Sequence, residues 1–163
     1  MFKLFILLIV LLSVSTYAGT EFFKLTGIHG QFGSSIAITE DGSWAAIGAP
    51  KWISEGAVYI YGRYDQYRWS YNKKIDGDYA AHANYGLSID TVLNALLIVG
   101  AEGATVGSLS YAGAANIYSV SSQGSSVNLL KVVNHASPER YGYFGSGVGA
   151  GVDGSSVYFA IGA

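Results

Sequence analysis

Three histidines are the residues of this sequence best suited to acid–base or metal chemistry: His29, His82 and His135. Imidazole is a common metal ligand, and its charge changes near neutral pH. His29 and His82 each stand three residues before an aromatic residue that opens a strand-like segment, whereas His135 stands nine residues before one. We favour a loop position shared by repeated segments, and the alternative is a ring of imidazoles that binds a metal ion or senses pH.

Other groups that perform catalysis are present without the partners they need. No serine lies in a G-x-S-x-G turn, the strained setting of a hydrolase nucleophile. Glu55, Glu102 and Glu139 fall in separate loops, so they do not form the close carboxylate pair that glycoside hydrolysis needs. The glycines from Gly145 to Gly151 resemble a dinucleotide-binding loop, but no helix is predicted after them. The sequence therefore predicts a protein that is not an enzyme and has no cofactor or metal.

Composition points to an all-β fold. Charged residues make up 12% of the chain, hydrophobic residues 50%, and the formal net charge is -2. Because nucleic-acid binding requires clustered Lys and Arg, we expect no nucleic-acid partner. The 22 glycines and 13 tyrosines, with only 2 prolines, are typical of many short strands joined by tight turns.

The N-terminus has the pattern of a secretory signal peptide over residues 1–18. Lys3 precedes an apolar run from Leu4 to Leu12, and the small residues Thr16 and Ala18 mark a cleavage site before Gly19. A retained membrane anchor is the alternative, but the run is shorter than the roughly 20 residues of a bilayer span. We expect a secreted or cell-surface protein with no other transmembrane span. Since the chain has no cysteine, packing must supply its stability.

A repeated pattern organises the rest of the chain. An aromatic residue and a glycine open each segment, in the pairs Phe32-Gly33, Tyr85-Gly86 and Phe144-Gly145. A second apolar segment then ends in Gly-Ala, in the pairs Gly48-Ala49 (followed by Pro50), Gly100-Ala101 and Gly162-Ala163. A third element recurs as GAVYIY from Gly56 and GAANIY from Gly113. Each unit has room for about four strands of ordinary length.

The first unit predicts four strands, at residues 32–39, 44–49, 56–61 and 67–75. The inner three are apolar and rich in small residues, whereas the last alternates aromatic and lysine side chains with polar ones. A four-stranded sheet that is buried at its inner edge and solvent-exposed at its outer edge is typical of a propeller blade. Glycine beside each aromatic residue would let neighbouring backbones approach closely where blades meet.

These phrases, FGSSIAI, AAIGAP, GAVYIY and RWSYNKKI, resemble the FG-GAP repeat, the unit of the β-propeller head of integrin α subunits. The resemblance covers residues 22–163 and implies a partial β-propeller of four-stranded antiparallel blades within a domain at residues 19–163. It assigns one blade to residues 32–75, a second to 85–133 and an incomplete third to 144–163. The segment at residues 22–27 resembles the outer strand of the blade that closes the ring.

A closed propeller of this repeat needs roughly 220 to 450 residues, more than this chain supplies. We therefore expect an N-terminal fragment whose remaining blades come from C-terminal sequence missing here. The alternatives are a small oligomer that completes the ring and a short protein that forms an open stack of sheets.

Integrin-type blades often carry a calcium loop between their first two strands, because Ca²⁺ needs six to eight oxygen ligands. The corresponding positions here read TEDGSW, DTVLNA and GVDGSS, with at most two carboxylates each. We interpret them as plain turns that bind no metal.

In integrin heads, the loops from strand four to strand one and from strand two to strand three share the face that binds ligand. The resemblance therefore makes the corresponding loops of this chain the best candidates for binding. They carry the residues that we predict as contacts: Trp52, Tyr79, His82, Tyr111 and Tyr141. Aromatic side chains often anchor binding sites, although a loop aromatic can also simply pack against its neighbours. The predicted function is adhesion through an unidentified protein or glycan ligand. The alternatives are an accessory domain of a larger secreted hydrolase and a purely structural surface repeat.

Overall fold

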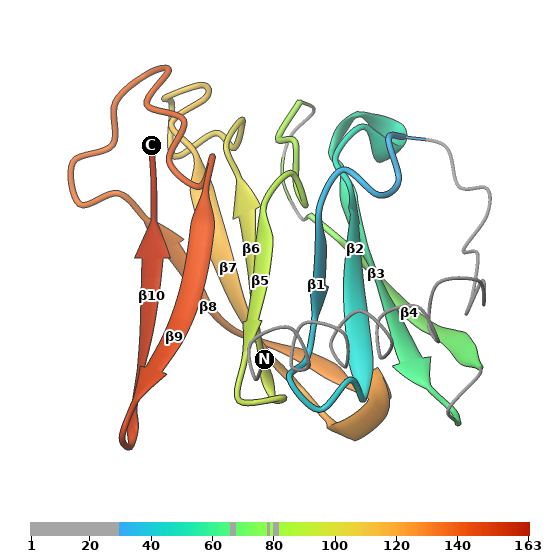
Figure 1. The fold of residues 1–163 in the computed structure, drawn as a ribbon. Helices are drawn as coiled ribbons and strands as arrows, with labels where there is room; N and C mark the ends of the chain where they lie inside the picture. The colour runs from blue at the N-terminus through green and yellow to red at the C-terminus, as the bar shows by residue number, and fades with distance from the viewer. Residues whose placement is uncertain (1–29, 66–67, 78, 80–81) are drawn as a thin grey trace, which may run out of the picture.

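The computed structural model describes residues 30–65, 68–77, 79 and 82–163. This part of the chain forms antiparallel strands in three groups that stand side by side (Figure 1). Two short 3-10 helices are also present, η1 (Trp52–Ser54) and η2 (Ser122–Gly124). The predicted signal peptide at residues 1–18, the predicted strand at residues 22–27 and His29 lie outside the described residues.

Each of the first two groups is a four-stranded sheet whose strands follow one another in chain order. The strands of the first sheet are β1 (Ile36–Ile38), β2 (Trp44–Ala49), β3 (Ala57–Arg63) and β4 (Trp69–Asp76). Those of the second are β5 (Ile89–Val92), β6 (Leu96–Ala101), β7 (Ala114–Val120) and β8 (Val127–Asn134). The third group is a hairpin of β9 (Val148–Asp153) and β10 (Ser156–Ile161). The prediction of an all-β protein with four-stranded antiparallel sheets is confirmed.

The first strand is shorter than the sequence pattern predicted. β1 begins at Ile36, whereas we expected the strand to begin at Phe32. Residues before β1 form a turn in which the backbone N–H of Ser34 donates to the carbonyl oxygen of Gln31 at 3.1 Å. Gln31 and Gly33 there have positive φ values of 61° and 93°, which are incompatible with an extended strand.

The burial of the strands follows their composition. Every residue of β2 is buried, in keeping with its unbroken run of apolar and small residues. β4 lies at the edge of its sheet, and most of its side chains are exposed. The register between β3 and β4 shifts at Ile60 and Tyr61, and the register between β7 and β8 shifts at Ile117 and Tyr118. The two sheets therefore share a bulge at equivalent positions, as repeats of one structural unit would.

The core lies between the first and second sheets. Trp44, Val58 and Ile60 of the first sheet are fully buried against Leu97 and Val99 of the second. Burying side chains of this size stabilises the fold by about 1.5–3 kcal/mol each. The sheets also interlock at their ends, because the indole Nε1 of Trp44 donates to the carbonyl oxygen of Asn94, 2.9 Å away in the turn between β5 and β6.

A small polar network lies inside this core. The hydroxyls of Tyr85 and Tyr118 lie 2.5 Å apart, and the amide of Asn116 donates to the hydroxyl of Tyr118 at 3.1 Å. The hydroxyl of Tyr79 donates in turn to the side-chain oxygen of Asn116. Burial, followed by the neighbouring Tyr118, raises the pKa of Tyr85 well above its usual value. These mutual hydrogen bonds offset the cost of placing polar atoms in an apolar interior.

The two junctions between successive groups have the same backbone geometry. A β-carbon on Gly48 would lie 2.0 Å from the carbonyl oxygen of Gly86, and one on Gly100 would lie 2.0 Å from that of Gly145. The hydroxyl of Ser35 donates to the Gly86 oxygen at 2.7 Å, as an equivalent serine does to the Gly145 oxygen at 3.0 Å. Both junctions therefore require a residue without a side chain at the point of contact.

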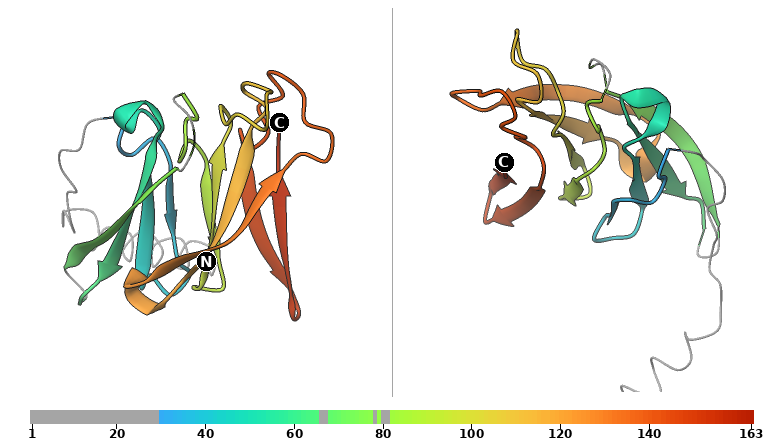
Figure 2. Two further views of the ribbon diagram at one scale, coloured as in Figure 1. Left: turned by 180° about the vertical axis from the view of Figure 1, so that it is seen from behind. Right: turned by 90° about the horizontal axis from the view of Figure 1, so that it is seen from above.

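The aromatic residue of each Phe-Gly or Tyr-Gly pair also meets a glycine across the junction. Tyr85 forms an isolated parallel bridge with Gly56, and Phe144 forms one with Gly113. Seen from above, β1, β5 and β9 lie next to one another on one side of the molecule, and β4 and β8 lie on the other (Figure 2). The repeated bridges hold the three groups in this order.

Candidate functional site

The loops that lead into β5 and β9 and those that join β2 to β3 and β6 to β7 gather at one end of the molecule, at the top of Figure 1. This end carries the residues that we predicted as contacts. Two of them pack against tyrosines of the core, two come together, and His82 stands apart.

Trp52 and Tyr79 pack against the sheets. The ring of Trp52 meets that of Tyr59 edge to face at 6.2 Å, and Lys74 Nζ lies 5.5 Å from the Trp52 ring centre. Tyr79 lies against Tyr85, with ring centres 6.1 Å apart, and belongs to the buried polar network. Both side chains are half-buried and make packing contacts with residues of the sheets or the core.

Tyr111 and Tyr141, in contrast, come together with a third tyrosine. The rings of Tyr111 and Tyr141 are stacked, with centres 5.6 Å apart and planes 21° apart. Tyr143 lies 6.1 Å from Tyr111 and 6.3 Å from Tyr141. The side chains of Tyr141 and Tyr143 are 57% and 42% exposed. We call these three residues the tyrosine cluster.

Backbone hydrogen bonds between two loops hold the tyrosine cluster in place. The N–H of Tyr141 donates to the carbonyl oxygen of Ser110 at 3.2 Å, and the N–H of Tyr143 donates to that of Tyr111 at 3.0 Å. The next residue, Phe144, donates to Ala112 at 3.1 Å. This short ladder joins the loop after β6 to the loop after β8, so the cluster forms only where the second and third groups meet.

All three tyrosines of the cluster have left-handed backbone conformations, with φ values of 57°, 63° and 51° in chain order. Gln31 and Asn84 occupy the position of Tyr143 in the other two units and have φ values of 61° and 52°. The backbone shape is therefore a property of the repeat. Asparagine tolerates this conformation well, whereas a bulky aromatic residue is strained in it.

His82 occupies the position of Tyr141 one unit earlier, also with a positive φ of 71°. It is exposed and lies outside the tyrosine cluster. Within the part of the chain that the structure describes, no three His, Cys, Asp or Glu side chains are grouped closely enough to hold a metal ion.

The acidic residues of the predicted turns hydrogen-bond to nearby backbone. Asp41 Oδ1 accepts the N–H of Ser43 at 2.9 Å, and this hydrogen bond is the main reason that the pKa of Asp41 lies below its usual value. Asp90 Oδ1 accepts the N–H of Thr91 at 2.8 Å, and Asp90 Oδ2 accepts that of Ala150 at 2.8 Å. Asp90 thus links the second sheet to the β9–β10 hairpin.

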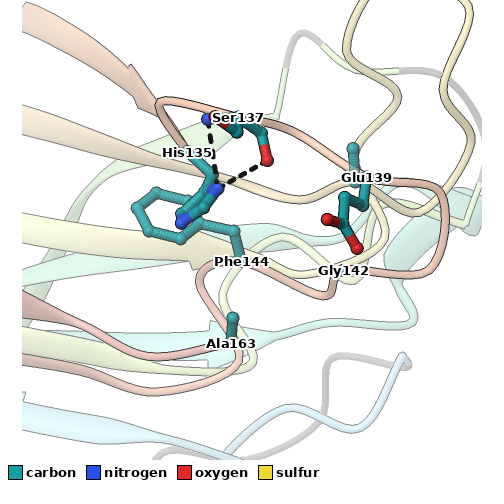
Figure 3. A pocket seen from close by; sticks show the side chains of 7 residues that line it. His135, Ser137, Glu139, Gly142, Phe144 and Ala163 are labelled. Atoms are coloured by element: carbon teal, nitrogen blue, oxygen red, sulfur yellow. Dashed lines mark hydrogen bonds between the residues drawn. The ribbon is translucent and has the colours of Figure 1, made fainter.

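A cavity of about 210 Å³ has Gly142 and Phe144, the sequence neighbours of Tyr143, in its lining (Figure 3). It is lined by Ala112, His135, Ser137, Glu139, Gly142, Phe144 and Ala163. The His135 and Phe144 rings lie 5.6 Å apart, and His135 Nδ1 lies 2.7 Å from the carbonyl oxygen of Ser137. The backbone N of Ser137 lies 3.3 Å from the same Nδ1, so the tautomer of His135 determines whether Nδ1 donates to the carbonyl oxygen or accepts from the N–H. Glu139 is exposed at the opposite wall.

Backbone occupies the equivalent place in the other two units. There, the N–H of Lys51 donates to the carbonyl oxygen of Gly30 at 2.9 Å, and the N–H of Gly103 donates to that of Ala83 at 3.0 Å. Gly142 is the counterpart of Gly30 and Ala83, two residues before the aromatic residue that opens its unit. In the third unit, Gly142 lines the cavity together with Ala163.

No protein-family model matches the chain, and no curated protein matches its sequence. The geometry of the molecule itself therefore carries the functional argument. Among the residues that the structure describes, no helix has the length and apolar character needed to cross a bilayer.

Sequence analysis missed Tyr143, and a signal for it was present. Aligning the three units places Gln31, Asn84 and Tyr143 at one position, immediately before the aromatic residue that opens each unit. Two units have a residue with a side-chain amide at this position, and only the third has an aromatic residue there. Only the loop ladder, however, shows that Tyr143 lies beside Tyr111 and Tyr141.

Proposed function

We propose that this protein is an exported, non-enzymatic β-propeller module of the FG-GAP type that binds a protein or a glycan at the cell surface or outside the cell. The proposed propeller rests on the two equivalent junctions, each formed by a bare glycine, a serine hydroxyl and an aromatic–glycine bridge. Such junctions, repeated around an axis, are what a ring of radial sheets requires.

The tyrosine cluster is the observation that carries the proposed binding function. The side chains of Tyr141 and Tyr143 are exposed and that of Tyr111 is half-buried, yet all three have a left-handed backbone that is strained for tyrosine. Burial in the core does not offset this strain. Strained residues that the surrounding structure holds in place are characteristic of ligand contacts. Tyrosine suits such contacts, since a rigid amphipathic ring offers a large contact area and loses little side-chain entropy on binding.

Binding of the fluorescently labelled protein to intact yeast and bacterial cells tests this proposal. We expect saturable binding that weakens at least roughly tenfold when Tyr111, Tyr141 and Tyr143 are all changed to Ser, a loss of about 1.4 kcal/mol or more. Tyr64→Ser is the matched control, because Tyr64 is 71% exposed in the loop between β3 and β4.

The class of partner follows from pretreatment of the cells. Periodate destroys the vicinal diols of glycans, and protease removes surface proteins. Loss of binding after only one treatment identifies the partner as a glycan or a protein. A triple variant that keeps native circular dichroism and binds as strongly as the parent protein would rule out the tyrosine cluster as the contact surface.

A further inference from the structure

The tyrosine cluster differs from the other tyrosine contacts of the molecule in its access to solvent. Tyr141 and Tyr143 are exposed, and Tyr111 is half-buried. Among the described residues, every other pair of tyrosine rings in contact has a buried member, which is Tyr59, Tyr61 or Tyr85. In the described part of the chain, the cluster is therefore the place where phenol rings in mutual contact are all accessible to a dissolved reagent.

Contact between accessible phenol rings allows one specific covalent reaction. A one-electron oxidant takes an electron from a tyrosine, the hydroxyl proton leaves to water, and a tyrosyl radical remains. Two such radicals join through a ring carbon next to each oxygen-bearing carbon, and the hydrogen on each joined carbon then moves to the oxygen of its own ring. The product, dityrosine, contains one new carbon–carbon bond. The two electrons and two protons released convert one hydrogen peroxide into two water molecules.

The rings of Tyr111 and Tyr141 are the closest pair of the cluster and are placed for this coupling. Their centres lie 5.6 Å apart with planes 21° apart, so the joining carbons are near one another before any oxidation. A stacked ring must turn before its edge meets the edge of its neighbour. The torsion that turns a tyrosine ring has broad wells, and these two rings lie at the surface of loops.

Backbone hydrogen bonds keep the two rings together while a radical lasts. The N–H of Tyr141 donates to the carbonyl oxygen of Ser110 at 3.2 Å, and the N–H of Tyr143 donates to that of Tyr111 at 3.0 Å. Holding two reacting groups side by side makes their reaction effectively unimolecular. Coupling within one chain should therefore outcompete coupling between chains in dilute protein.

We infer that the tyrosine cluster is an oxidative cross-linking site, at which a peroxidase using hydrogen peroxide joins Tyr111 to Tyr141 as dityrosine. The chain contains no cysteine, so it cannot form a disulfide. Tyr111 lies between β6 and β7, and Tyr141 lies between β8 and β9. The new bond would thus tie the second sheet covalently to the loop that enters the third group.

The experiment treats the intact purified protein, at micromolar concentration, with a haem peroxidase and a limiting amount of hydrogen peroxide. Dityrosine fluorescence should appear in the monomer fraction after size-exclusion chromatography. Peptide mass spectrometry should find the peptides that contain residues 111 and 141 joined to each other, with the loss of two hydrogen atoms. The yield per chain should stay the same when the protein is diluted, because intrachain coupling does not depend on concentration.

Tyr111→Phe should lose most of the dityrosine fluorescence of the monomer, because the change keeps the ring and removes the hydroxyl that forms the radical. Tyr71→Phe is the matched control. Tyr71 is also exposed and contacts two tyrosine rings at 5.9 and 6.3 Å, but both of those partners are buried, so this variant should keep the yield of the parent protein. After oxidation, the Tyr143 amide should exchange hydrogen more slowly in the parent protein and at an unchanged rate in Tyr111→Phe.

Four outcomes would overturn the inference: no dityrosine once the peroxide is consumed, dityrosine only in dimers, an intrachain link only between other tyrosines, or full fluorescence in Tyr111→Phe. A phenylalanine ring can pack as tyrosine does, and native circular dichroism of each variant before oxidation shows that the fold is kept. The inference goes beyond the proposed binding function. Because oxidation is measured on purified protein without cells, either one can fail while the other stands.

Discussion

Gly48 lies so close to Gly86 of the next unit that a β-carbon on Gly48 would be 2.0 Å from the Gly86 carbonyl oxygen. Gly100 and Gly145 repeat this relationship one unit later, with the same distance of 2.0 Å. The contact is between backbone atoms, so no side-chain rotation can relieve a clash there. Sheet spacing in this protein thus depends on glycines at the junctions, since Gly56 and Gly113 likewise leave no room for a β-carbon.

Gly48→Ala and Gly100→Ala should each destabilise the protein by about 2–4 kcal/mol, because the added methyl group forces the sheets apart. Urea unfolding followed by circular dichroism measures the change. Gly151→Ala is the matched control, since a β-carbon there would meet no atom within 4 Å, and it should change stability by no more than about 0.5 kcal/mol. Equal effects of Gly48→Ala and Gly151→Ala would show that the junction is not tightly packed.

Asp90→Ala should loosen the β9–β10 hairpin. The change removes the carboxylate that accepts the Ala150 N–H in a charge-assisted hydrogen bond of 2.8 Å. We expect the free energy of local opening of the hairpin to fall by about 1–3 kcal/mol. Hydrogen exchange at the Ala150 amide measures this directly. Asp90→Asn keeps one oxygen and should give an intermediate rate. Unchanged protection of Ala150 in Asp90→Ala would show that the hairpin does not depend on this link.

Stability should fall as the pH rises above about 10, the usual pKa of tyrosine. The pKa of buried Tyr85 is raised well above that value, so the folded state keeps its proton where the unfolded state loses it. Unfolding then releases a proton and is favoured by high pH, whereas below pH of about 10 this group has no effect.

Tyr85→Phe should flatten this alkaline loss of stability, and Tyr64→Phe, in an exposed loop, should not. Urea unfolding at a series of pH values from neutral to alkaline measures both. At neutral pH, Tyr85→Phe should cost about 1 kcal/mol through its hydrogen bond with Tyr118. An unchanged pH dependence in Tyr85→Phe would contradict the assignment of the effect to this residue.

Tyr143→Asn should stabilise the protein by about 0.5 kcal/mol, because Asn tolerates the left-handed backbone better than Tyr does. Thermal unfolding measures the gain, and binding to cells should weaken at the same time. The reciprocal change Asn84→Tyr should destabilise, since Asn84 hydrogen-bonds to Lys51 at 2.6 Å and to Glu102 at 3.0 Å. A destabilised Tyr143→Asn would show that ring stacking outweighs backbone strain.

Strand positions were predictable where composition alone decides them. β2 was predicted with its observed bounds, since an apolar run rich in small residues between a turn and a Gly-Ala pair leaves few alternatives. β1 was predicted too long. The turn at residues 31–34 depends on local backbone hydrogen bonds, which an apolar pattern does not reveal.

The candidate site was less predictable than the sheets. Five contact residues were predicted, and the structure brings only Tyr111 and Tyr141 together. Trp52 and Tyr79 are aromatic residues between strands as well, yet each packs against a buried tyrosine, Tyr59 and Tyr85 respectively. Whether a loop aromatic is exposed depends on which neighbour lies within reach, and sequence distance does not contain that information.

By itself, the sequence determined the all-β class, the repeat and the glycines of each unit, because turns and close backbone contacts restrict residue type locally. The tertiary structure decided which loops meet and which tyrosines form a cluster. Those features depend on contacts between residues of different units, such as Tyr111 with Tyr141, and the pairing arises only when the sheets stack.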